Sequence, residues 1–106
     1  MAWVYLAAAG VLEIVWAFFM KKSEGFTLIT PTIITIVTMF ASFGLLSISM
    51  KTLPLGTAYT IWTGIGAVGA FVVGIAFLGE AVTVTRVIAA LLILSGIITL
   101  KIASTH

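Results

Sequence analysis

Four long apolar stretches, separated by short polar breaks, dominate the sequence. They cover residues 2–20, 31–50, 57–78 and 84–103, and each is close to the roughly 20 residues that an α-helix needs to cross a bilayer. The 106-residue chain is 62% apolar and only 8% charged, which leaves too few charges to cover the surface of a soluble domain. We therefore expect an all-α integral membrane protein whose residues 1–106 form one domain of four transmembrane helices.

Polar residues and helix signals mark the borders of these stretches. Two lysines and Gly25 follow the first stretch. They predict the end of the first helix there, because cations and glycine are favoured at a helix C-terminus. Thr30 followed by Pro31 predicts an N-cap and the first residue of the second helix. Thr83 is the predicted N-cap of the fourth helix.

The composition excludes several classes of function. There is no cysteine, and the one histidine is the last residue, His106, so we expect neither a disulfide framework nor a metal site. The cations are scattered, so no nucleic-acid partner is expected. Residues 64–69 match the G-x-G-x-x-G pattern, but they lie inside an apolar stretch with no preceding strand. We expect no enzymatic activity and no cofactor.

The positive charges do not favour one orientation in the membrane. Four spans place the N-terminus, Lys51 and Lys101 on one side, and Lys21, Lys22 and Arg86 on the other. The positive-inside rule needs a larger bias than this. Two alternatives stay open: one fixed topology set by another factor, or insertion in both orientations. The second would allow an antiparallel dimer, which supplies from two copies what larger membrane proteins encode as inverted repeats.

Glu13 lies near the middle of the first stretch and is the strongest candidate for function. A carboxylate at that depth costs roughly 2.5–3.5 kcal/mol on insertion scales, so it should face protein or a water-filled cavity. Such a group can exchange a proton for a bound cation. The alternative is a protonated Glu13 that bonds to a neighbouring helix. Gly10, one turn earlier, leaves space beside the carboxyl group.

Aromatic residues lie at helical spacing around this position. Trp16 follows Glu13 by one turn, and its indole face can bind an organic cation. Tyr59 and Trp62 share a face of the third stretch, where the alternative is an interfacial aromatic belt. Ser42, in the middle of the second stretch, can bond a carboxylate or its own helix. We predict that these five residues bind substrate and protons.

Small residues predict a hinge and a packing seam. Gly64 and Gly66 weaken the third helix enough to bend it, although close packing would also explain them. Ala89, Gly96 and Ala103 recur every seven residues in the fourth stretch. We expect this seam to lie between protomers, because four short helices enclose little on their own.

The chain resembles the small multidrug resistance family over its whole length, and four stretches carry the resemblance, two of which contain Glu13, Trp16, Tyr59 and Trp62. The stretches are residues 9–17, 23–27, 53–64 and 96–101. Within the family, the chain resembles the guanidinium-exporter subtype at three positions. Trp16 stands where the quaternary-ammonium subtype tends to have glycine, and Met39 replaces a tyrosine of that subtype's pocket. Lys101 marks the subtype where the other has an uncharged residue.

The resemblance implies an antiparallel homodimer in the bacterial inner membrane. The Glu13 carboxylates of both protomers would share one central site, surrounded by Trp16, Ser42, Tyr59 and Trp62. We interpret the chain as a proton-coupled antiporter for guanidinium and small substituted guanidinium cations, with protons and substrate competing for the Glu13 pair. Pairing with a related chain also stays open.

Two other functions remain as alternatives. One is a quaternary-ammonium or multidrug cation exporter that uses the same Glu13. The other is a non-transporting membrane assembly subunit in which Glu13 only bridges helices. Thr60 and Lys22 depart from the residues that are common in the family, which leaves the substrate range open.

Overall fold

Four α-helices make up the computed structural model, which describes residues 1–103. The helices are α1 (Ala2–Lys22), α2 (Ile29–Ser49), α3 (Leu55–Leu78) and α4 (Val84–Ala103), and no strand occurs within the described residues. Each helix is long and apolar enough to cross a membrane. The predicted all-α chain with four helices of membrane-spanning length is confirmed. His106, the residue on which the metal prediction rested, lies outside the described range.

The helix starts show which of the predicted caps operate. Helix α2 begins at Ile29 rather than at Pro31, so the prediction of a Thr30 cap is wrong. Leu28 precedes the helix with extended backbone, and Pro31 lies in the first turn, where its missing N–H would have no partner anyway. Thr83 does cap α4, because the Arg86 backbone N–H donates to its Oγ1 at 3.2 Å.

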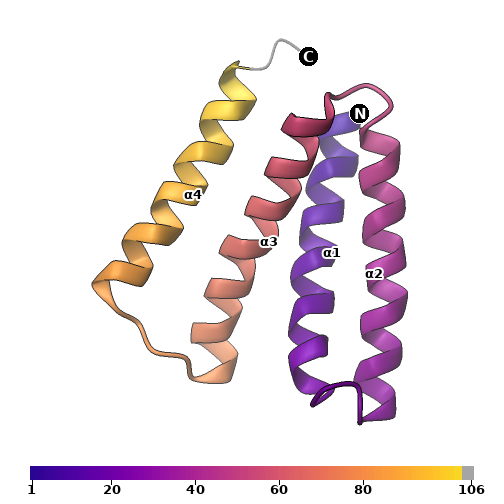
Figure 1. Ribbon diagram of the computed structural model, residues 1–106, viewed down its shortest axis with the longest axis vertical. Helices are drawn as coiled ribbons and strands as arrows, with labels where there is room; N and C mark the ends of the chain where they lie inside the picture. Colours follow the sequence, from indigo (N-terminus) through magenta and orange to yellow (C-terminus); the bar gives the residue numbers. More distant parts are fainter. Residues whose placement is uncertain (104–106) are drawn as a thin grey trace.

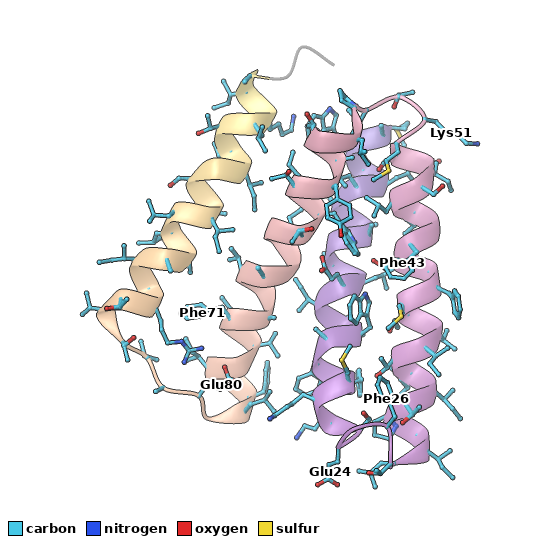
Figure 2. The ribbon with its side chains drawn as sticks, viewed as in Figure 1. Glu24, Phe26, Phe43, Lys51, Phe71 and Glu80 are labelled. Atoms are coloured by element: carbon cyan, nitrogen blue, oxygen red, sulfur yellow. The ribbon has the colours of Figure 1, made fainter. Side chains whose placement is uncertain are left out.

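The helices lie side by side in a thin slab of 43 × 34 × 16 Å. Helix α1 packs against α2 and α3, whereas α4 lies at one edge beside α3 (Figure 1). The N-terminus, the α2–α3 turn and the end of α4 lie at one end of the slab, and the other two loops lie at the opposite end (Figure 1). Figure 2 accordingly shows Lys51 at one end, and Glu24 and Glu80 at the other.

The core is small and belongs to the first three helices. Its buried apolar side chains come from α1, α3, the end of α2 and the α2–α3 turn: Leu6, Ala9, Leu46, Leu53, Ala58, Ile61 and Trp62. All residues of α4 are described, and none of them is buried. Large apolar side chains are exposed on every helix, for example Phe40 on α2 and Phe77 on α3. Such a surface suits lipid or a second protein in the membrane.

Candidate functional site

The Glu13 carboxyl group faces α3 and contacts bare backbone there. Glu13 is half-buried, and its Oε1 atom is buried without a hydrogen-bond partner among residues 1–103. The carboxyl group occupies the space that a Cβ atom at Gly66 would need. A side chain at position 66 would therefore collide with the carboxyl group. Gly66 thus makes room for an acidic group at the α1–α3 interface.

Two more glycines let α1 and α3 approach closely around this point. A Cβ at Gly69 would collide with Ile14, and a Cβ at Gly10 would lie 2.6 Å from Cγ2 of Ile65. Gly10 is buried, so within one chain the space beside it is filled by a side chain of α3. Glycine rows of this kind allow the tight helix packing that is common in membranes.

Four aromatic rings form a row that begins at Trp16, one helical turn after Glu13 on α1. Trp16 meets Phe43 edge-on with ring centroids 6.3 Å apart, and Phe43 lies 5.7 Å from Trp62. Trp62 in turn lies 5.5 Å from Tyr59. Figure 2 shows Phe43 on α2. The Nε1 of Trp16 is buried and has no hydrogen-bond partner in the described chain. The row therefore combines aromatic faces with an indole N–H that no protein atom of the same protomer satisfies.

Ser42 joins three helices through one hydroxyl group. It donates to the backbone carbonyl of Ala9 at 2.7 Å and accepts from Nε1 of Trp62 at 3.0 Å. The single hydroxyl proton of Ser42 is thus donated to the backbone of α1. The hydroxyl oxygen accepts the indole N–H of Trp62 and so holds that ring in place. In this chain Ser42 positions the aromatic row and does not donate to the Glu13 carboxyl group.

The remaining predicted residues lie in other places. Tyr59 is 53% exposed and stands at the end of the aromatic row. It also lines an apolar groove of about 530 Å³ between α3 and α4, together with Gly64 and Gly96. Met39 is half-buried on α2. The seam residues are all exposed on α4: Ala89, Gly96 and Ala103.

Phe43 is the site residue that sequence reasoning missed. It contacts both tryptophans of the row, Trp16 and Trp62. It follows Met39 by four residues, so the two share a face of α2. Helical spacing from Met39, which replaces a pocket tyrosine of the quaternary-ammonium subtype, is the signal that identifies Phe43.

The chemistry of this cluster suits a monovalent organic cation. One carboxylate lies within the membrane with an acceptor oxygen unsatisfied, and the aromatic row begins one helical turn away at Trp16. Aromatic faces attract cations most strongly where water is excluded. In the described part of the chain, no three His, Cys, Asp or Glu side chains gather where they could hold a metal ion.

Comparison with known sequences decides the family. The family model described as "Small Multidrug Resistance protein" matches residues 1–93. The chain belongs to this family. The match confirms the resemblance inferred from the sequence. With its four membrane-spanning helices, this small multidrug resistance protein is a multi-pass protein of the bacterial inner membrane.

Curated relatives match almost the whole chain. A protein named "Guanidinium exporter" from Yersinia pseudotuberculosis serotype I is 55% identical over 104 residues, which cover 98% of this chain and 100% of the relative. Proteins of the same name come from Citrobacter freundii and Salmonella typhimurium strain LT2, both 54% identical. The match to the Citrobacter protein covers 100% of this chain and 100% of that relative. The match to the Salmonella protein covers 98% of this chain and 99% of that relative.

Proposed function

We propose that this protein is an antiporter that exports guanidinium and small substituted guanidinium cations in exchange for protons. The observation that carries the proposal is the Glu13 carboxyl group, which lies within the membrane with one buried oxygen unsatisfied. A buried acceptor without a partner is costly, so a bound donor stabilises it. The curated relatives named guanidinium exporters support this choice of substrate.

Guanidinium matches the site in shape as well as in charge. The cation is planar and can donate two parallel N–H bonds to one carboxylate, which a spherical cation cannot do. Its flat face can stack on an aromatic ring, and Trp16, one helical turn after Glu13, begins a row of such rings with Phe43. A proton that binds the same carboxylate neutralises its negative charge. Proton and guanidinium therefore compete for Glu13, so one leaves before the other binds.

The proposal includes an antiparallel homodimer with the two Glu13 groups in one site. One protomer leaves Glu13 only half-buried and leaves the small residues of α4 exposed. A second copy packed on Ala89, Gly96 and Ala103 would cover that face. The near balance of cations between the two ends of the chain supports insertion in both orientations. Titration would then belong to the pair of carboxyl groups.

Alternating access would follow from bending of α3 at Gly64 and Gly66. The contact between Gly66 and the Glu13 carboxyl group supports this step, because any bend at Gly66 moves backbone that touches the carboxylate. Occupation of Glu13 by a proton or a cation would thereby bias the bend. The two protomers would exchange conformations and open the shared site to the opposite side.

Proton release on binding tests the competition directly. Guanidinium added to purified dimer in weakly buffered detergent should release protons from the parent protein, because the cation displaces them from Glu13. The Glu13→Gln variant should release none. Release of equal size from Glu13→Gln would mean that another group carries the proton, and would overturn the proposal.

A quaternary-ammonium exporter is the second candidate, and the four-ring aromatic row favours it. Trp16, Phe43, Trp62 and Tyr59 offer extended apolar surface to a bulky cation. Such a cation has no N–H to donate, so it would bind by aromatic contact alone. Proton release by tetrapropylammonium equal to that by guanidinium would favour this function.

A further inference from the structure

Helix α4 contributes no fully buried side chain to the core of its protomer. None of its residues, all of which are described, is buried. An apolar groove of about 530 Å³ lies between part of α4 and α3. Two half-buried side chains of α4, Ile97 and Leu100, pack against the core cluster of the first three helices. Its two charged residues, Arg86 and Lys101, make further contacts at its two ends.

The contact at the C-terminal end of α4 joins it to the start of α1. The Nζ of Lys101 lies 4.6 Å from the ring centroid of Trp3, which is cation–π distance. Trp3 packs against the core cluster of the first three helices. Lys101 thus ties α4 to the most firmly packed part of the chain, across a span of about a hundred residues in sequence (3 against 101).

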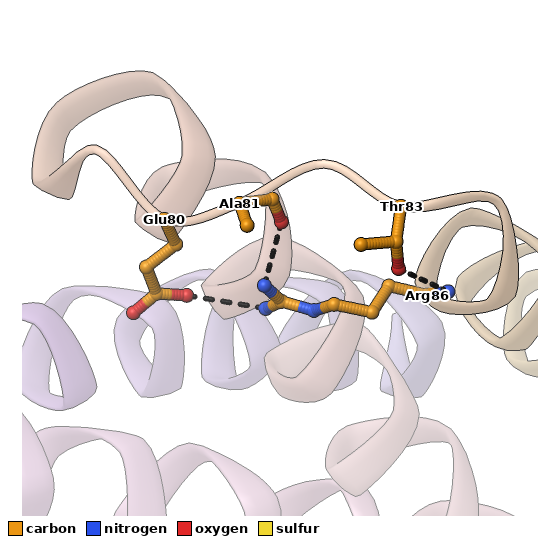
Figure 3. A network of polar contacts seen from close by, with 4 residues as sticks. All are labelled: Glu80, Ala81, Thr83 and Arg86. Carbon is orange, nitrogen blue, oxygen red and sulfur yellow. Dashed lines mark hydrogen bonds and ion pairs between the residues drawn. The ribbon is translucent and has the colours of Figure 1, made fainter.

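The contact at the N-terminal end joins α4 to the end of α3. Arg86 lies over the ring of Phe71 at 5.1 Å, and its Nη1 donates to the Ala81 carbonyl at 2.6 Å. Its Nη2 pairs with Oε1 of Glu80 at 3.3 Å (Figure 3). The Glu80 carboxyl group lies against Gly74, which has no side chain to displace it. Arg86 therefore fixes both the loop and the helix start.

Between the two ends, α4 touches α3 closely at one glycine. A Cβ at Gly64 would lie 2.7 Å from Cδ1 of Ile97 and 3.4 Å from Cγ2 of Ile93. Because Gly64 has no side chain, Ile97 and Ile93 of α4 can pack directly on the α3 backbone at this point. Helix α4 thus packs on its protomer through Ile97 and Leu100, and one cation makes an additional contact at each end.

We propose that Arg86 and Lys101 are positioning residues, which hold α4 at a fixed place on its own protomer through their contacts with Phe71 and Trp3. This inference goes beyond the proposed function, because it concerns how the helix is placed and not what binds to Glu13. Lys101 holds α4 to α1, whereas Arg86 holds it to the far half of α3. The two contacts therefore set where the exposed small-residue seam of α4 is presented.

A distance measurement tests the Lys101 contact without any transport assay. The chain has no cysteine, so spin labels can be attached at V11C and I98C, two exposed positions on α1 and α4. Labelled chain is diluted into excess unlabelled chain, so that each distance lies within one protomer. We expect a narrow distance distribution in the parent. Trp3→Leu and Lys101→Met should each broaden it, and the double variant should be no broader than either single one.

Conservative and unrelated substitutions complete the test. Lys101→Arg keeps a cation over the ring, so it should keep the narrow distribution. Lys51→Met removes an exposed cation of the α2–α3 turn and should leave the distance distribution within one protomer unchanged. In liposomes, Lys101→Met should lower the maximal transport rate about fivefold and change the KM less than about twofold. An unchanged distribution in both single variants, or broadening that adds up in the double variant, would overturn the proposal. Either result would leave proton release at Glu13 unaffected, so the two proposals fail separately.

Discussion

At the scale of single residues, the account depends on the pairing of Glu13 with Gly66. A charged group in the middle of α1 needs space and partners, and α3 supplies only space at this point. The sequence predicted the importance of both residues. It did not predict that they touch, because the contact depends on how two helices cross, and helical periodicity within one helix does not report on that.

Replacing the carboxylate should separate transport from assembly. Glu13→Gln keeps the size of the side chain but cannot release a proton, so we expect guanidinium-driven transport to fall to background. The proposed dimer should persist, because the seam residues of α4 are untouched. Size-exclusion chromatography with light scattering measures assembly beside the flux assay. Loss of the dimer in Glu13→Gln would instead favour a role as a bridge between helices.

A methyl group at position 66 should impair transport by a different route. Gly66→Ala places a Cβ where the Glu13 carboxyl group lies, so the carboxylate has to move. We expect at least about a tenfold loss of transport, the effect of a misplaced reacting group.

Gly44→Ala is the matched control for Gly66→Ala. Gly44 lies within α2 and has open space around it. The Gly44→Ala variant should transport normally. Its α2 helix should gain up to about 1 kcal/mol of stability, since alanine is the better helix former. Equal transport by the two alanine variants would contradict the role given to Gly66.

At the scale of helices, Ser42 shows how a single polar group can hold three elements together. Its hydroxyl group links the Ala9 carbonyl on α1 to the Trp62 indole on α3. We predicted a functional Ser42 from its depth in α2, but the sequence could not identify its partners. Both are distant along the chain, and the ordinary alternative, a bond to its own helix, is local.

Removing this hydroxyl group should destabilise the bundle. Ser42→Ala leaves the Ala9 carbonyl and the Trp62 N–H without their buried partner, which costs roughly 1–3 kcal/mol. We expect a lower midpoint in thermal or denaturant unfolding in detergent. Ser47→Ala, at an exposed position of the same helix, should leave the midpoint within error. A midpoint for Ser42→Ala equal to that of Ser47→Ala would contradict the bridging role.

The helices themselves were largely predictable, and their ends were less so. The four apolar stretches correspond to four helices because length and hydropathy are local properties. Thr83 was identified correctly as a cap, whereas Thr30 was not, because α2 begins at Ile29 before it. Phe43 and the contacts of Lys101 escaped prediction, since both depend on which helices become neighbours.

At the scale of the whole molecule, the balance of charge between the two ends of the chain is the notable property. Lys51 and Lys101 lie at one end of the slab, opposite Lys21, Lys22 and Arg86. The structure adds that Arg86 is paired with Glu80, so part of the charge at the more basic end is neutralised. The positive-inside rule counts Lys and Arg rather than net charge, so the count of two against three is what leaves neither orientation preferred.

Charge balance makes insertion sensitive to one added cation. Topology reporters fused to the C-terminus should detect molecules with the C-terminus on each side of the membrane. Thr52→Lys adds a cation beside Lys51 and should shift the chain towards one orientation, whereas Thr52→Ser should not. Transport should fall with the loss of the minor orientation. A C-terminus found on one side only in the parent would contradict the antiparallel homodimer.

The central claim is exchange of guanidinium for protons at Glu13, and proton flux in liposomes tests it most directly. Purified chain is reconstituted alone, a guanidinium gradient is applied, and internal pH is followed by a trapped dye. The account predicts proton movement opposite to guanidinium in the parent and none in Glu13→Gln. Guanidinium movement without proton movement, or equal flux from Glu13→Gln, would contradict it.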